Sequence, residues 1–419
     1  MTQGAVGQSE IRPPAKVPER LTRRGVPVDP TLRVLALGTF VNRAGTGAAV
    51  TTFALFFTQE VGLAAAEVGL VLSVAALVAM AGQVPLGHLG DTRGPRETMR
   101  ALTLAAGVVL LGLLVARSFW AVLAVMSLAT LLMVGNGAVR NGYIARIATG
   151  GRGVQFKAYL RAVTNVAMSL GAALGGLALL IDATWAYLAV FAVDGVATIA
   201  TGFICSRLPH LPPSPARAAG EPRLAVLRDR PFVAVTVLNG LVAMHFVVME
   251  LGIPLWIAAH TEAPKSMVAV LLVLNTVAVA AFQVRLTRGV DDVPASARAM
   301  VVGCAWIAAG FVIVSFSAGT TAAVAVVMLL LGATVHVVGE MISSGGQWGI
   351  SMGLAPDARQ GQYQGFAGLG FSLSNVVAPT LIALLCIEWG RPGWWVMAAL
   401  VLGAGLLQVP VCRWALRTR

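Results

Sequence analysis

Five charged side chains stand deep inside long apolar segments, and they are the residues best placed to do chemistry. They are Arg43, Arg140, Asp194, Glu250 and Glu340. A charge at the centre of a membrane helix costs about 2.5–3.5 kcal/mol on insertion scales, so it is kept where it faces a partner or a water-filled cavity. We therefore expect ligand-binding or ion-coupling groups among these side chains.

Helical spacing places most of these charges on polar stripes, because residues about four or seven apart share one helix face. The stripes are His336, Glu340, Ser343 and Gln347; Asn136, Arg140 and Tyr143; and Asn239, Phe246 and Glu250. Lipid does not tolerate such stripes, but a cavity does. The residues that we expect to bind substrate or couple protons are Arg43, Asn136, Arg140, Glu250, His336 and Glu340.

The individual roles leave alternatives open. Glu250 could exchange protons with the outside, because burial disfavours the charged form of a carboxyl group, or it could be a polar residue of an outer cavity. Glu340 could pair with Arg43 or Arg140, either as part of the coupling mechanism or as a permanent structural ion pair. His245 and His336 could relay protons or could be hydrogen-bonded packing residues. Asp194 is interpreted as a structural partner.

The composition indicates a membrane protein. Of the 419 residues, 57% are hydrophobic and only 11% are charged, whereas soluble proteins keep about a quarter of their residues charged. The mean hydropathy is +0.81. The net charge of +12 could suggest nucleic-acid binding, but the basic residues form short clusters between apolar runs, as in cytoplasmic membrane loops. We therefore expect a lipid bilayer and no nucleic acid as partner.

A membrane-spanning helix needs about 20 mostly apolar residues, and the chain offers twelve such segments. They are approximately 32–57, 66–86, 99–116, 120–145, 158–181, 184–206, 232–258, 266–284, 298–317, 321–349, 363–386 and 393–413. The fold class that we predict is an all-α membrane protein with twelve transmembrane helices in two six-helix bundles. The predicted domains are a disordered basic tail (1–31), one bundle (32–206), a proline-rich linker (207–231) and a second bundle (232–419).

The distribution of basic residues predicts the orientation. With the N-terminus inside, all 30 Lys and Arg residues fall in cytoplasmic segments except Arg43, Arg117, Arg140, Lys265 and Arg391. This asymmetry is what the positive-inside rule describes, so both termini are predicted to be cytoplasmic in a multi-pass protein of the cell membrane. Six tryptophans also fall near predicted outer helix ends, as in an interfacial belt: Trp120, Trp185, Trp256, Trp389, Trp394 and Trp395.

The loop after the second segment carries a motif, "GHLGDTRGPRETMR" at residues 87–100. It resembles the cytoplasmic loop signature of the major facilitator superfamily. The matching residues are Gly87, Leu89, Gly90, Asp91, Gly94 and Arg96, whereas Thr92 and Pro95 replace usual basic residues. Glycines permit close helix approach and tight turns. The loop "VRLTRGVDDVPASAR" in the second half looks like a degenerate copy, as parallel six-helix repeats predict.

The resemblance implies two bundles, a central cavity lined by the first, fourth, seventh and tenth helices, and a loop that latches the halves in the outward-facing state. Within the family, "GNGAVRNGYIA" around Arg140 loosely resembles an arginine motif of proton-coupled drug exporters. The fifth segment, "SLGAALGGLALL", has Gly171, Gly175 and Gly176 but lacks the proline of the drug antiporter motif. Its small residues still suit close helix packing.

The function that we predict is proton-coupled export of a small hydrophobic or amphipathic compound, a drug or natural product, by alternating access. We therefore expect an antiporter of the multidrug efflux type that uses protons as its coupling ion. We also expect the protein to be a monomer. The alternative is an importer or facilitator of a small metabolite or organic anion. A sugar is disfavoured, because the sequence offers no obvious cluster of Asn, Gln and Trp for sugar hydroxyls.

The sequence lacks the motifs that would indicate other classes of function. The sequence has no HExxH, GxSxG or phosphate-binding P-loop, so we expect no enzyme, no catalytic residue and no cofactor. The four cysteines, Cys205, Cys304, Cys386 and Cys412, lie in apolar runs without metal-ligand spacing, so we expect neither a metal site nor a disulfide. A channel would not need two asymmetric halves joined by a latch-like loop.

Overall fold

The structure is a computed structural model that describes residues 21–23, 26–148, 151–215 and 224–418. Most of the predicted tail (1–31) and part of the predicted linker (207–231) lie outside the described residues. The domain bounds therefore stay predictions.

The described residues of the first half form six helical rods after a short hairpin. They are β1 (Thr22–Arg23) and β2 (Val26–Pro27), then α1 (Pro30–Leu55) with the π-helical turn η1 (Phe56–Glu60), α2 (Ala65–Arg93), α3 (Pro95–Leu111) with the 3₁₀ turn η2 (Gly112–Leu114), α4 (Phe119–Ile147), α5 (Gly151–Ile181) and α6 (Thr184–Cys205).

In the second half, the residues that the structure describes (224–418) also form six rods, two of which contain π-helical turns. They are η3 (Ala225–Arg228), α7 (Arg230–Val247) continued by η4 (Val248–Gly252) and α8 (Ile253–His260), α9 (Met267–Leu286), α10 (Val293–Ser315), α11 (Ala322–Leu354), η5 (Asp357–Arg359), α12 (Gln360–Ile382) with η6 (Ala383–Glu388), and α13 (Arg391–Arg417).

Three helices begin with the same local chemistry, an aspartate at the N-cap and a proline in the first turn. Asp29, Asp229 and Asp292 each accept backbone N–H groups of the first turn of α1, α7 and α10. The carboxylate satisfies N–H groups that have no partner within the helix, and proline suits the first turn because it lacks an N–H. These sequence signals fix where the three rods start.

Eleven of the described helices are long and apolar enough to cross a membrane. The twelfth rod, α1 with η1, is long enough but is not among them. Its middle carries Asn42 and Arg43 as well as several glycines and threonines, which lower its apolarity. The all-α fold class predicted from the sequence is confirmed.

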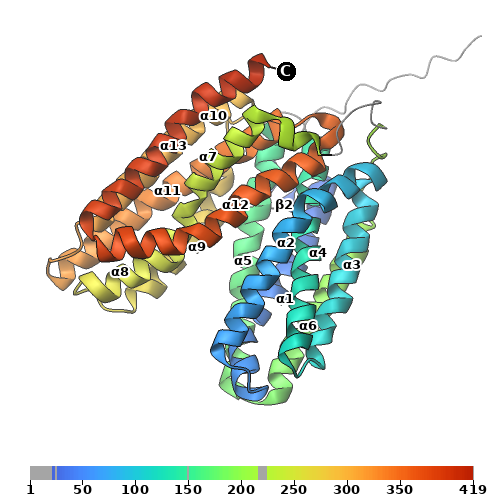
Figure 1. The fold of residues 1–419 in the computed structure, drawn as a ribbon, viewed down its shortest axis with the longest axis horizontal. Coiled ribbons are helices and arrows are strands. Elements are labelled where there is room, and N and C mark those ends of the chain that lie inside the picture. The colour runs from blue at the N-terminus through green and yellow to red at the C-terminus, as the bar shows by residue number, and fades with distance from the viewer. Residues whose placement is uncertain (1–20, 24–25, 149–150, 216–223, 419) are drawn as a thin grey trace, which may run out of the picture.

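The rods form two bundles that approach each other at one end and diverge at the other (Figure 1). The near end carries the C-terminus, and the far ends are those of α8 in one bundle and of α1 and α6 in the other. Between the bundles, α2 and α4 pack against α12, while α5 packs against α9 and α11.

Close packing within the first bundle depends on glycine. A Cβ atom at Gly171 of α5 would lie 2.1 Å from the carbonyl oxygen of Ala44 in α1, and one at Gly175 would lie 2.6 Å from that of Ala48. Both distances are too short for any side chain, so α1 and α5 touch through their backbones. Gly176 differs, because a Cβ there would meet nothing within 4 Å.

The six tryptophans of the predicted belt divide into two groups. Trp120, Trp185, Trp389 and Trp395 are exposed, as the predicted belt requires. Trp256 and Trp394 are instead fully buried and pack edge to face in the core of the second bundle. The belt prediction is therefore wrong for these two, because their position near a helix end does not reveal that the ring turns inward.

Candidate functional site

A cavity of about 790 Å³ lies between the two bundles and takes side chains from both. Six amide side chains line it: Gln83, Asn141, Asn239, Gln347, Gln364 and Asn375. They come from α2, α4, α7, α11 and α12. An amide both donates and accepts hydrogen bonds, so this lining can bind hydroxyl, carbonyl or carboxylate groups of a small polar molecule.

Aromatic rings share the cavity with the amides. Phe246, Trp348 and Phe371 line it. Rings beside amide groups are a common arrangement around small molecules, because the rings provide apolar contact and the amides fix orientation. The expectation that no cluster of Asn, Gln and Trp exists for sugar hydroxyls is therefore wrong. The residues lie on five helices that are far apart in the sequence, and only the fold collects them.

The charges on the cavity wall have one sign. Arg43 of α1 and Lys157 and Arg161 of α5 line it, and no aspartate or glutamate does so among the described residues. Lys157 lies over the ring of Trp348, at 5.5 Å from the ring centre. Arg161 lies over the ring of Phe246, at 5.1 Å. The first bundle therefore supplies the cations of the cavity, and the second bundle supplies aromatic faces against two of them.

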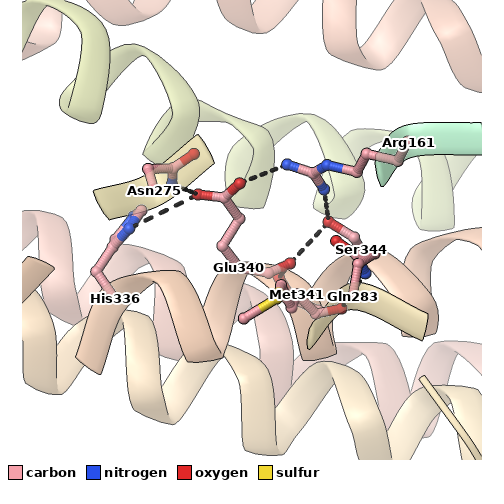
Figure 2. A network of polar contacts seen from close by, with 8 residues as sticks. Arg161, Asn275, Gln283, His336, Glu340, Met341 and Ser344 are labelled. Atoms are coloured by element: carbon pink, nitrogen blue, oxygen red, sulfur yellow. Dashed lines mark hydrogen bonds and ion pairs between the residues drawn. The ribbon is translucent and has the colours of Figure 1, made fainter. Parts of the chain in front are cut away.

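Arg161 joins the two bundles through a buried ion pair with Glu340 of α11 (Figure 2). The same guanidinium group donates to the hydroxyl of Ser344. The amide nitrogen of Asn275 in α9 donates to the other carboxylate oxygen of Glu340 at 2.9 Å. The side chains of Arg161 and Glu340 are 19% and 3% exposed, so water screens their attraction little.

The sequence predicted a different partner for Glu340. Arg43 or Arg140 was expected, but Arg161 makes the contact, so this expectation is wrong. Arg161 was missed because the fifth span was expected to begin at 158, which placed this residue at the membrane edge. In the structure α5 begins at Gly151, and Arg161 follows Lys157 by one helical turn on the cavity side.

Arg140 and Asn136 lie behind the cavity rather than on its wall. Both line a small pocket inside the first bundle, together with Arg43. Arg43 lines both the pocket and the central cavity, whereas Arg140 lines the pocket but not the cavity. Asp194 of α6 is the acidic group that attracts Arg43, and it accepts a hydrogen bond from Thr46 at 3.2 Å. The structure thus brings Arg43, Asn136 and Arg140 together.

His336 and His245 are buried beside Glu340. The His336 Nδ1 atom lies 3.8 Å from the nearer Glu340 oxygen, and neither ring nitrogen of His336 has a hydrogen-bond partner among the described residues. Potential ligand atoms of His245, His336 and Glu340 all lie within 4.8 Å of one another, so these three could hold a metal ion. The guanidinium of Arg161, already bound to Glu340, would repel that ion.

Glu250 stands apart from this network. It lies in the π-helical turn η4 and is exposed, and it is absent from the wall of the central cavity. The stripe predicted for the seventh segment is therefore divided. Asn239 and Phe246 line the cavity, while Glu250 lies beyond it.

The loop motif joins the two bundles at their near end. The two carboxylate oxygens of Asp91 accept the backbone N–H groups of Gly361 and Gln362, each at 2.8 Å. These N–H groups belong to the first turn of α12, where the helix dipole favours a negative charge. Asp91 is 4% exposed, so this contact between the bundles is dry.

The glycines of the motif allow this approach. A Cβ at Gly87 would lie 2.2 Å from the carbonyl oxygen of Gly361, and one at Gly90 would lie 2.7 Å from Val139 of α4. Gly94 has φ +92°, which glycine adopts without strain, and it forms the turn between α2 and α3. Arg96 donates to the carbonyl oxygen of Leu208, which follows α6.

Comparison with known proteins identifies the class. The sequence profile of the Major Facilitator Superfamily matches residues 35–379, so this chain belongs to that superfamily. It is accordingly a multi-pass membrane transporter of small molecules and not an enzyme.

Among curated proteins, a relative from Deinococcus radiodurans is 33% identical over 199 residues, which cover 45% of this chain and 47% of the relative. Its name designates it, provisionally, a sugar efflux transporter. The match thus spans about half the length of that relative.

Solved structures of the same fold cover nearly the whole chain. The human organic anion transporter TETRAN is 16% identical with a TM-score of 0.67, covering 92% of this chain and 99% of its own. A bacterial homologue of the iron transporter ferroportin, in the outward-facing state, is 14% identical with a TM-score of 0.69, covering 93% and 100%. The fucose–proton symporter of E. coli is 11% identical with a TM-score of 0.67, covering 92% and 98%. These likenesses establish the fold.

Proposed function

We propose that this protein is a proton-coupled exporter of a small polar solute of the sugar class, which it moves across the cell membrane by alternating access. The observation that carries the proposal is the cavity between the bundles, whose wall combines six amide side chains with aromatic rings. Such a wall favours a hydroxyl-bearing solute over the hydrophobic compound that the sequence suggested, because amides facing a purely apolar ligand would lose their hydrogen bonds.

The sugar efflux name of the Deinococcus relative supports the same class of solute. The match covers about half of each protein, so this support is secondary to the cavity wall. An amphipathic solute stays compatible with the site, since Trp348 and Phe371 can cover the apolar face of a sugar ring while the amides bind its hydroxyl groups.

The arrangement of the bundles supports an outward-facing state. The near end, where Asp91 binds α12, is closed, and the bundles diverge toward the other end (Figure 1). If the termini are cytoplasmic, as the basic residues predict, the open end faces the outside. A substrate that has just been exported would leave from this state.

Proton coupling is proposed at Glu340. Its partner Arg161 belongs to the other bundle, so opening of the near end would pull the two apart. A buried carboxylate without its cation is costly, and taking up a proton removes that cost. For protons to enter as solute leaves, Glu340 would take up its proton from the outside before the near end opens and release it to the cytoplasm when solute binds in the inward-facing state. The pair with Arg161 would then form again as the near end closes. Separation of the pair and protonation of Glu340 would thus occur together.

Transport in proteoliposomes tests the proposal. Purified protein would be reconstituted, and uptake of labelled glucose, xylose and a lipophilic cation would be measured with and without an imposed pH gradient. Because the proposed exchange moves protons against the solute, sugar uptake should be faster into vesicles with an acidic interior than into vesicles without a gradient. Transport of the lipophilic cation alone would instead support the multidrug type, and sugar uptake indifferent to pH would support a facilitator.

A further inference from the structure

The charges around the central cavity are unbalanced. Two acidic groups that interact with its cations are already engaged, Glu340 with Arg161 and Asp194 with Thr46 and Arg43. Lys157 has no such group. Its ammonium makes no hydrogen bond or ion pair among the described residues, and its described neighbour on the cavity wall is the ring of Trp348.

Arg43 is also incompletely satisfied. Its Nε atom is buried and lacks a hydrogen-bond partner among the described residues, and no carboxylate forms a direct ion pair with it there. Arg140, a second cation, lines the small pocket into which Arg43 also extends. This adds positive charge behind the cavity wall without adding an acid.

Half-buried cations without a direct ion pair are unfavourable in a membrane interior and mark sites where an opposite charge binds. Arg43 and Lys157 belong to α1 and α5 of the same bundle and line the same cavity. The amides and rings of the opposite wall come mostly from α7, α11 and α12. A ligand that spans the cavity would therefore meet cations on one side and neutral groups on the other.

We propose that the transported solute is an anionic sugar, whose carboxylate or phosphate group binds to Arg43 and Lys157 while its hydroxyl groups face the amides of the second bundle. This rests on the proposed sugar-class function and narrows it. Charge-assisted hydrogen bonds to lysine and arginine are stronger than neutral ones, so they supply preference for the acid over the neutral sugar. An anion that leaves the cell also moves with the membrane potential.

Binding of four related compounds tests this inference on the purified full-length protein. The compounds are glucuronate, glucose 6-phosphate, neutral glucose and citrate, and the signal is the fluorescence of Trp348, with Trp348→Phe as the signal control. We expect the two anionic sugars to bind about tenfold more tightly than glucose. Comparing the affinities of glucuronate and glucose 6-phosphate shows whether the site prefers a carboxylate or a phosphate group.

Three variants identify the residues. Lys157→Gln and Arg43→Gln each remove a cavity cation, and Lys265→Gln removes an exposed lysine far from the cavity as the matched control. We expect the first two substitutions to weaken the binding of anionic sugars about tenfold and the binding of glucose little. The control substitution should change neither affinity.

The outcomes separate the two proposals. Glucose that binds as tightly as the anionic sugars, or a preference that survives in both cavity variants, overturns the anionic inference and leaves sugar transport standing. Binding of citrate but of no sugar, lost in Lys157→Gln, supports the anion site and overturns the sugar class. If none of the four compounds binds to folded protein, both proposals fail.

Discussion

At the scale of residues, the buried pair of Arg161 and Glu340 is the contact on which the proposed coupling depends. It crosses between bundles, and Asn275 holds the second carboxylate oxygen in place. A pair that takes part in coupling has to break in each transport cycle, whereas a permanent structural pair across the two halves would stay intact. The structural alternative that the sequence left open for Glu340 therefore predicts different behaviour of its variants.

Glu340→Gln tests the coupling role. Glutamine keeps the shape but cannot be charged, so we expect transport driven by a pH gradient to fall at least tenfold, while exchange of solute without a gradient persists. Flux assays in proteoliposomes measure both. Glu262→Gln, in the exposed loop before α9, is the matched control. Equal losses of driven transport and exchange would show that Glu340 serves the structure or the binding of solute and not coupling.

A double-mutant cycle tests whether the pair is buried and tight. Arg161→Gln leaves the Glu340 carboxylate without its cation, and breaking a buried pair in this way costs about 3–5 kcal/mol. The double variant with Glu340→Gln should be more stable than Arg161→Gln alone. As a control, Arg152→Gln breaks a more exposed pair with Asp29 and should cost about 1 kcal/mol or less. Unfolding in detergent gives the values, and an additive cycle would contradict the pairing.

Glu250 is expected to matter less than the sequence suggested. It is exposed in η4 and outside the cavity wall, so Glu250→Gln should reduce driven transport less than Glu340→Gln does. Parallel flux measurements on the two variants, with expression checked by size-exclusion chromatography, compare them directly. A larger loss in Glu250→Gln would move the coupling site to the open end of the second bundle.

At the scale of elements, α2 and α12 meet with no room between them, and Gly87 sits at the contact. A Cβ there would overlap the carbonyl oxygen of Gly361, so Gly87→Ala has to push the two helices apart. Overpacking of this kind costs about 1–3 kcal/mol, which shifts the population away from the closed near end. We expect faster labelling of an added cysteine at that end. Gly176→Ala, where a Cβ meets nothing within 4 Å, should leave labelling unchanged.

The negative charge of Asp91 also stabilises the closed near end. An asparagine in its place would keep one oxygen but lose the negative charge at the start of α12, a change worth about 0.3–1 kcal/mol and up to about 2 kcal/mol when partly buried. Asp91→Asn should therefore slow turnover by a few-fold to about thirtyfold and leave solute binding intact. Binding and turnover have to be measured on the same preparation. Losses of equal size in both would argue against a latch.

The elements themselves could largely be predicted from the sequence. Apolar length marks the rods, Asp with proline marks three helix starts, and the glycine-rich loop marks the contact that Asp91 makes. Arg161 could not be found in this way. The start of α5 is polar, so hydropathy begins the span too late and assigns this residue to the membrane edge, although the helix continues inward from Gly151.

Which residues line the cavity could not be predicted from the sequence either. Gln83, Asn141 and Asn375 lie in three different helices, and each looks like an isolated polar residue in an apolar run. Their common direction depends on how the rods rotate and pack, which periodicity within one rod cannot supply. The same limit explains the wrong partner for Glu340, since pairing across bundles depends on tertiary packing.

At the scale of the whole molecule, alternating access requires two bundles that rock about the central cavity. The Asp91 contact joins the bundles at the near end and the Arg161–Glu340 pair joins them beside the central cavity. The far ends diverge (Figure 1). In the other state these contacts should open and the far ends should meet. Because both ends depend on one rigid-body motion, their distances should change in opposite directions.

Distances between spin labels test this rocking motion most directly. The native cysteines are all buried, so labels go to added cysteines, Ser118→Cys with Ser266→Cys at the far end and Thr92→Cys with Asp357→Cys at the near end. Pulsed electron resonance would be recorded with and without a transported sugar and at two pH values. We predict that the far-end distance shortens under the same conditions in which the near-end distance lengthens. Two distances that change together, or an end that never moves, would contradict alternating access around this cavity.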